Sequence, residues 1–255
     1  MKDQLQHFFE LLFAMTEREL RARYKHTIFG FLWIVANPLL QMLVIGFVFT
    51  FILKQPVKNY YYFLFTGLLV WNFFSTSLLK ATPSIVYERS LIKKARFPHA
   101  IIPVSIVLSN FIHFLIAFIL IFIPTVFLGT LTLLLMPQIV FAVFLLSVFT
   151  TGLSLLTSSL NVRFRDISFL VQALLIVWFY ATPIIYSLTM IPRPVLWLWR
   201  FNPLTSILQL LQQALLGLPG PGPGMLVSNI GVILLVAVLG VHVFQKESKN
   251  FDDWL

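Results

Sequence analysis

The chain has 255 residues, of which 59% are hydrophobic and only 11% are charged, and its mean hydropathy is +0.91. A soluble domain carries roughly 25% charged residues, so this composition excludes a sizeable soluble domain and indicates an integral membrane protein. The formal net charge of +9 does not indicate a nucleic-acid-binding surface, because the basic residues sit in short loops between apolar runs.

The N-terminal segment, from about residue 4 to residue 25, predicts a helix that lies in the membrane interface. Apolar side chains recur there at helical spacing, opposite charged ones, which is typical of an interfacial amphipathic helix and not of a span. The apolar positions are Leu5, Phe8, Phe9, Leu12, Met15 and Leu20.

Five long uncharged runs follow, and the longest, over residues 97–162, has room for two of the ~20-residue helices that cross ~30 Å of hydrocarbon. Pro38 is expected to kink the first of these spans and Pro183 to interrupt the fifth. We expect the spans at about 30–53, 60–79, 101–128, 138–160, 167–186 and 225–244.

The segment between the fifth and sixth spans, at about 187–217, has a different composition. It carries Arg193, Arg200 and Asn202 among leucines and tryptophans, which favours short helices that dip into the outer interface and return. The predicted fold class is therefore all-α integral membrane, with an N-terminal interfacial helix, six transmembrane helices and short re-entrant outer helices before the last span.

The distribution of Lys and Arg predicts the orientation of the chain. Of the 18 such residues, all but Lys54, Lys58, Arg193 and Arg200 fall in the N-terminal segment, the loops after the second and fourth spans, and the tail. The positive-inside rule then places both termini in the cytoplasm.

The sequence contains no pattern that would let the chain power transport by itself. No Asp, Glu, Lys or Arg lies in the middle of a predicted span, which disfavours an ion-coupled carrier. His113, in the third span, is the titratable exception, and a hydrogen-bonded packing role is favoured over a proton relay. No Gly-Lys pair occurs, so the chain lacks a phosphate loop for ATP. With no cysteine and no metal-ligand or catalytic spacing, another subunit must supply energy for any work.

Several motifs resemble, in order, the permease subunits of ABC transporters that export polysaccharides. The resemblance covers nearly the whole chain, and its motifs are specific in combination. The matching stretches are "RELRARYKHTIFGFLWIVANPLLQ" (18–41), "FTGLLVWNFFS" (65–75), "ERSLIKKARFPHAIIP" (88–103), "NVRFRDI" (161–167), "YATPIIYS" (180–187) and "FNPLTSILQLLQQALLG" (201–217). The first of them places five residues on the family's interface helix, namely Arg18, Glu19, Arg21, Arg23 and Tyr24.

The resemblance implies a homodimer in the bacterial cytoplasmic membrane, with two copies of a separate ATPase subunit that binds ATP and magnesium. No cofactor is then expected in this chain. It also implies a channel for a lipid-linked sugar polymer of the O-antigen, teichoic acid or capsule type. The chain would be a transport subunit and not itself an enzyme.

The resemblance further implies that a cytoplasmic coupling segment, at about 85–99, docks into a cleft of the ATPase. Apolar anchors within a charged rim are typical of a docking element, although the same cations also satisfy the topology rule alone. The predicted anchors are Leu91, Ile92 and Phe97, and the predicted rim is Glu88, Arg89, Lys93, Lys94 and Arg96. The second cytoplasmic loop adds Arg163, Arg165 and Asp166, for which orientation alone is an equal explanation.

A sugar polymer needs a lined conduit, because each hydroxyl stripped of water without a partner costs a few kcal/mol. Aromatic side chains could line it, although Trp and Tyr also favour membrane interfaces and Phe favours helix packing. The candidates are Phe31, Trp33, Trp71, Phe73, Trp178, Phe179 and Tyr180. Two alternatives stay open, namely a permease of the same fold for a lipid or a small amphiphilic drug, and a non-transporting membrane scaffold.

Overall fold

The computed structural model describes residues 2–24, 30–52, 57, 59–94, 97–127 and 135–254, and within these residues every regular element is helical. The longer helices are α1 (Lys2–Tyr24), α2 (Trp33–Phe47), α3 (Tyr60–Ala81), α6 (Ile101–Phe127), α7 (Met136–Arg163), α8 (Ile167–Tyr180), α10 (Pro203–Leu216) and α11 (Pro223–Glu247). The short ones are η1 (Gly30–Leu32), η2 (Val48–Ile52), α4 (Ser84–Tyr87), α5 (Arg89–Lys94), η4 (Leu188–Met190), η5 (Arg193–Val195), α9 (Trp197–Arg200), η6 (Ser248–Asn250) and α12 (Phe251–Trp254).

Five helices in the described part of the chain are long and apolar enough to cross a membrane. They are Trp33–Ile52, Tyr60–Ala81, Ile101–Phe122, Met136–Arg163 and Pro223–Asn250. The first runs through Pro38 and finishes as the π-helical turn η2. These lengths follow from uncharged runs that bury their backbone hydrogen bonds within each helix.

The fifth predicted span, at 167–186, differs from the helix found there. α8 ends at Tyr180 after 14 residues, which at 1.5 Å per residue is about 21 Å. Pro183 explains the early end, since it has no N–H to bond the carbonyl of Phe179 and disfavours helical backbone at Thr182. The chain continues through turns in which Thr182, Pro183 and Ile184 are buried.

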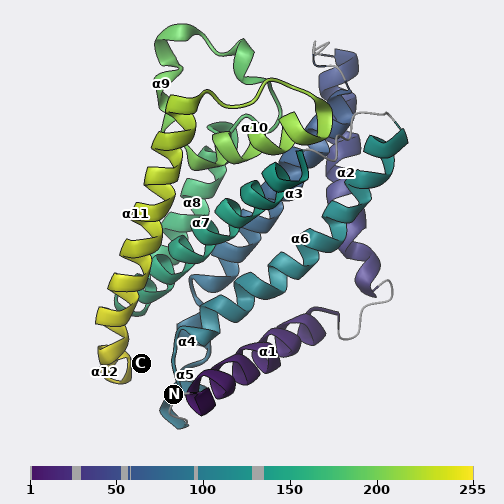
Figure 1. The fold of residues 1–255 in the computed structure, drawn as a ribbon. Coiled ribbons are helices and arrows are strands. Elements are labelled where there is room, and N and C mark those ends of the chain that lie inside the picture. The colour runs from purple at the N-terminus through teal and green to yellow at the C-terminus, as the bar shows by residue number, and fades with distance from the viewer. Residues whose placement is uncertain are drawn as a thin grey trace.

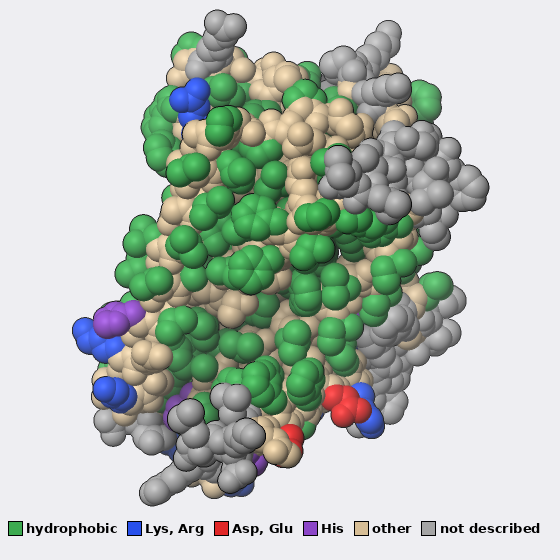
Figure 2. Space-filling model, viewed as in Figure 1, with side chains coloured by type: hydrophobic (Ala, Val, Ile, Leu, Met, Phe, Trp, Pro, Cys, Tyr) green, Lys and Arg blue, Asp and Glu red, His purple; other side chains and the backbone are tan. Residues whose placement is uncertain are grey.

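The long helices form one bundle, and the short helices lie at its two ends (Figure 1). α1 lies across the lower end, where α4, α5, α12 and both termini are also found, and α9 and α10 lie at the upper end. On the face shown in Figure 2, hydrophobic side chains fill the middle, and most of the charged ones lie near the lower end. This distribution is that of a chain surrounded by lipid between two aqueous layers.

The main core is formed by α3, α6, α7 and α10. α3 is buried on nearly all sides, as expected for a helix that is apolar around its whole circumference. α10 lies within the predicted outer segment at 187–217, yet it is mostly buried against α3, α7 and α11. Gly217, with a φ of 65°, ends α10 in the left-handed conformation that glycine adopts without strain.

α7 and α11 pack closely against each other, at a crossing where Gly152 and Gly240 meet. A Cβ added to Gly240 would lie 2.8 Å from the carbonyl carbon of Gly152, and one added to Gly152 would lie 2.6 Å from the Cα of Ala237. Small residues allow such close approach of backbones in membrane proteins, where van der Waals packing drives association.

Asn202 joins the end of α8 to the start of α10 through four hydrogen bonds. Its Oδ1 accepts from Trp178 Nε1 at 3.1 Å and from the Leu204 N–H at 3.2 Å. Its Nδ2 donates to the Ala181 carbonyl at 3.0 Å and to Thr182 Oγ1 at 2.9 Å. The amide is thus fully satisfied, as a buried polar group should be.

Candidate coupling surface and transport cavities

The predicted coupling segment forms two short helices, α4 and α5, that α1 holds from one side. The two terminal nitrogens of the Arg18 guanidinium, Nη1 and Nη2, donate to the carboxylate of Glu88, with 3.4 Å between Nη1 and Oε2. Burial lowers the pKa of Arg18, but the hydrogen bond and the charge of Glu88, followed by those of Glu19, outweigh it and raise this pKa above its ordinary value. Arg18 therefore stays charged at any physiological pH.

The apolar side chains of the segment pack against other parts of the same chain. Ile92 is only 4% exposed and lies in a second core with Ile85, Leu12 of α1 and Phe251 of α12. Ile92 therefore faces its own chain and not an outside cleft, because the C-terminal helix and α1 close over it. Leu91 and Phe97 also pack against this core and are half-buried.

Other side chains of the segment face outward. Tyr87 is 79% exposed, the highest value among the large hydrophobic residues described, and Arg89, Lys93 and Lys94 are exposed beside it. Arg96 lies outside the described residues. The sequence analysis did not select Tyr87, although its place two residues after the buried Ile85 on a short helix was a usable signal.

The predicted second cytoplasmic loop contacts the C-terminal tail. The guanidinium of Arg163 lies 5.1 Å from the ring centre of Phe164 and 5.6 Å from that of Trp254, which are cation–π distances. Asn161 Oδ1 accepts from the Ser168 N–H at 3.1 Å and so caps α8. Arg165 and Asp166 are exposed.

The predicted interface residues on α1 divide between two environments. Arg21 is exposed and pairs with Glu17 one turn away, at 2.5 Å, whereas Glu19 pairs with Arg18 at 3.5 Å. Arg23 points to α6, where its Nη2 donates to Asn110 Oδ1 at 2.5 Å and its Nη1 contacts His113 Nδ1. The side chain of Tyr24 lies outside the described residues.

The structure brings three of the aromatic candidates together around one cavity of about 480 Å³, here called the aromatic cavity. Trp71 of α3 meets Phe179 of α8 with ring centres 5.4 Å apart, and Phe179 meets Tyr180 at 5.3 Å. The amide side chains of Gln41, Asn72 and Gln172 also line it.

The other aromatic candidates lie elsewhere. Phe73 is buried against Phe111 and Phe114, and Trp178 points inward to Asn202 and to Phe74. Trp33 is exposed and lines a different cavity. The side chain of Phe31 lies outside the described residues.

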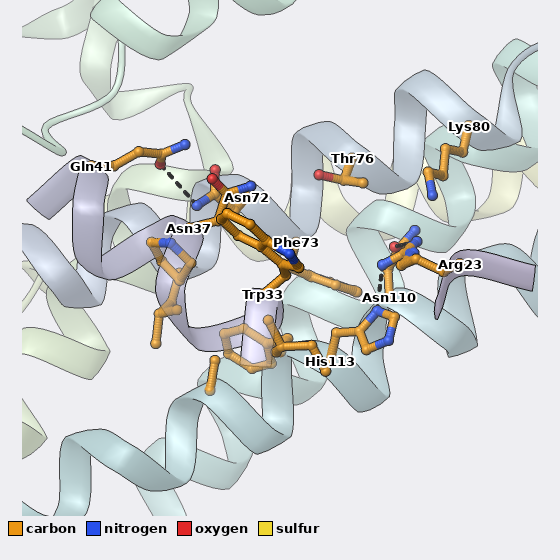
Figure 3. A pocket seen from close by; sticks show the side chains of 15 residues that line it. Arg23, Trp33, Asn37, Gln41, Asn72, Phe73, Thr76, Lys80, Asn110 and His113 are labelled. Atoms are coloured by element: carbon orange, nitrogen blue, oxygen red, sulfur yellow. Dashed lines mark hydrogen bonds between the residues drawn. The ribbon is translucent and has the colours of Figure 1, made fainter. Parts of the chain in front are cut away.

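A second cavity of about 480 Å³, here called the polar cavity, lies among α2, α3, α6 and the end of α1 (Figure 3). Arg23, Lys80, Asn110 and His113 surround one end of it. The amides Asn37, Gln41 and Asn72 also line it, among mostly apolar side chains, and Asn72 Nδ2 donates to Gln41 Oε1 at 3.0 Å. Gln41 and Asn72 also line the aromatic cavity, so this pair stands between the two.

Comparison with known proteins gives consistent results over most of the chain. The family model described as ABC-2 type transporter matches residues 10–216. Two proteins from Klebsiella pneumoniae, both named O-antigen export system permease protein RfbA, are each 35% identical across 82% of this chain and 81% of their own length. A protein of the same name from Myxococcus xanthus is 33% identical across 96% of this chain and 95% of its own.

Proposed function

The chain belongs to the ABC-2 type transporter family, and from this membership we propose that it is the channel-forming permease subunit of an exporter for lipid-linked O-antigen polysaccharide. The observation that carries the proposal is the 33% identity to an O-antigen export permease across 96% of the chain. In this family the ATPase is a separate subunit, so ATP and magnesium bind there.

We propose that the chain crosses the cytoplasmic membrane six times, with both termini in the cytoplasm. α8 is short, but the buried turns that follow it continue toward α9 at the opposite end of the bundle. Non-helical backbone is tolerated at membrane depth where protein covers it. The excess of Lys and Arg at the end that holds both termini supports this orientation.

We propose that a second copy of the chain covers the faces of α2 and α8. Large apolar side chains are exposed along both helices and along η2, which continues α2. They include Val44 on α2, Phe51 on η2, and Phe169 and Val177 on α8. The aromatic cavity lies between these helices and α3. Two copies that meet here would enclose two aromatic cavities along one pathway, as a polymer channel requires.

The proposal is tested on the complex of the chain with its ATPase subunit in nanodiscs. Lipid-linked O-antigen should stimulate ATP hydrolysis, and a strain that lacks its own permease should regain surface O-antigen when the complex is expressed. Stimulation by a small amphiphile alone, without surface O-antigen, would instead identify a lipid or drug exporter.

Tyr87→Ala should weaken binding of the ATPase subunit roughly 10-fold to 100-fold, because an exposed aromatic beside a charged rim has the character of an interface hot spot. The dissociation constant of the purified subunits measures this effect. Trp197→Ala is the control, since Trp197 is an exposed aromatic on α9 at the opposite end. Equal binding by wild type and the Tyr87 variant would remove Tyr87 from the coupling surface.

Tyr180→Ala should lower export roughly 5-fold to 30-fold, because it removes one sliding face for a sugar ring, worth about 1–2 kcal/mol. Surface polysaccharide per inserted permease is the measurement. Phe144→Ala is the matched control, because Phe144 on α7 is 61% exposed, close to the 62% of Tyr180, and does not line the aromatic cavity. Equal losses in both variants would mean that the cavity has no special role.

A further inference from the structure

The polar cavity has the charge of an anion-binding site (Figure 3). Arg23 and Lys80 line it, and none of its fifteen described lining residues is Asp or Glu. Glu19 lines a neighbouring hollow together with Lys80, but its carboxylate is shared with Arg18 at 3.5 Å. The described wall of the polar cavity thus carries two positive charges and no negative one.

His113 adds no third charge, yet it helps to orient the first. A guanidinium can only donate hydrogen bonds, so His113 Nδ1 must accept from Arg23, and the ring is neutral with its proton on Nε2. Together with the bond to Asn110, this contact fixes the Arg23 guanidinium at one end of the cavity. The Arg23 side chain is thus preorganised, so a ligand would not have to order it on binding, and this favours affinity.

The cavity extends from the end of the bundle toward its middle. Lys80 is one residue from the end of α3, and Asn72 is eight residues deeper, which is about 12 Å along the helix. Asn37 and Gln41 on α2 are exposed, so the cavity opens along that helix. The two cations thus lie near the end of the bundle, and the neutral amides lie deeper.

From these features we propose that the polar cavity binds the phosphate or diphosphate headgroup of a lipid, and that this lipid is the anchor of the exported polymer. The inference rests on the proposed function. Arg23 would bind the phosphate oxygens through the paired N–H groups of its planar guanidinium. Lys80 would bind them as a point charge. The lipid chain would remain in the bilayer beside α2, and the neutral amides would face the less charged part of the headgroup.

The position of the Gln41–Asn72 pair supports the choice of a sugar-bearing lipid over an ordinary phospholipid. These two amides line both cavities. A headgroup held by Arg23 and Lys80 would direct its first sugar toward them, and Trp71 and Tyr180 lie on the far side. The volume of about 480 Å³ falls within the 300–1,000 Å³ of typical small-molecule sites, so it accommodates more than a phosphate.

The test measures binding by the full chain in nanodiscs of phosphatidylcholine, with farnesyl diphosphate as the soluble lipid-diphosphate probe. Wild type should bind it roughly 10-fold to 100-fold more tightly than Arg23→Gln or Lys80→Gln, because each variant loses a charge-assisted hydrogen bond. Lys80→Gln is the safer variant, since no described hydrogen bond depends on the Lys80 side chain. Lys246→Gln removes an exposed cation on α11 near the same end and should bind as wild type does.

Two further ligands identify the source of the phosphate. Inorganic pyrophosphate should bind at least 10-fold more weakly than farnesyl diphosphate, and nanodiscs that contain phosphatidylglycerol should reduce farnesyl diphosphate binding less than threefold. Equal affinity for inorganic pyrophosphate would mean a free-phosphate site, and strong competition by phosphatidylglycerol would mean a general phospholipid site. Either result, or equal binding by the Lys80 and Lys246 variants, would overturn the inference.

This binding measurement involves neither the ATPase subunit nor transport. Its failure would leave the export function standing. A chain that binds farnesyl diphosphate but restores no surface O-antigen would count against the export function alone.

Discussion

Replacing Gly240 with valine should destabilise the chain by about 3 kcal/mol, because the new side chain would enter the space of the α7 backbone. Its Cβ alone would lie 2.8 Å from the carbonyl carbon of Gly152, and a backbone atom cannot rotate away as a flexible side chain can. The two helices would have to separate along a contact that holds the last span against the core. Unfolding by graded denaturing detergent, followed by circular dichroism, measures the loss.

Gly231→Ala is the matched control for this prediction. Gly231 lies on the same helix, and a Cβ added there meets nothing within 4 Å. Alanine should leave stability unchanged or raise it slightly, because it is the better helix former. If the valine at position 240 were tolerated as well as the alanine at 231, α7 and α11 would not cross as closely as described.

Replacing Asn202 with leucine should also cost about 3 kcal/mol, because it leaves several buried groups without hydrogen bonds. The indole N–H of Trp178 and the N–H of Leu204 would lose their acceptor, and the carbonyl of Ala181 would lose a donor. Leucine keeps the branched shape of asparagine although it is larger, so the loss would be chiefly one of polar satisfaction.

Two companion variants separate the network from a general effect of substitution. Trp178→Phe removes one of the four bonds and should cost about 1 kcal/mol, and Gln245→Leu alters an exposed amide on α11 and should be neutral. Thermal unfolding of the three proteins in the same detergent gives the comparison. A leucine variant as stable as wild type would show that Asn202 does not join α8 to α10.

The all-helical class and the membrane-long helices were predictable because they depend on local composition. A run of uncharged residues must satisfy its backbone hydrogen bonds within itself in lipid, so hydropathy alone indicates a helix. The end of α8 at Tyr180 was less predictable. Pro183 gave the signal for an interruption, but only the buried packing of Thr182 and Ile184 allows the chain to remain non-helical afterwards.

The arrangement of the site was not predictable from local patterns. The Arg18–Glu88 pair joins residues 70 positions apart, and Ile92 turns inward because α1 and α12, from opposite ends of the sequence, cover it. Trp178 and Tyr180 look alike in the sequence, yet Asn202 draws the first inward while the second stays 62% exposed. Such choices depend on tertiary contacts between distant segments.

α1 is bonded at two places to two different parts of the chain. Arg18 holds the coupling segment at Glu88, and five residues later, which is about 7.5 Å along the helix, Arg23 holds α6 at Asn110. A displacement of the coupling segment relative to α6 must therefore move α1 or break one of these contacts. α1 thus provides a mechanical link between the proposed ATPase-facing surface and the wall of the polar cavity. If one state of the ATPase changes the affinity of that cavity by some factor, occupancy of the cavity must change the equilibrium of the ATPase states by the same factor.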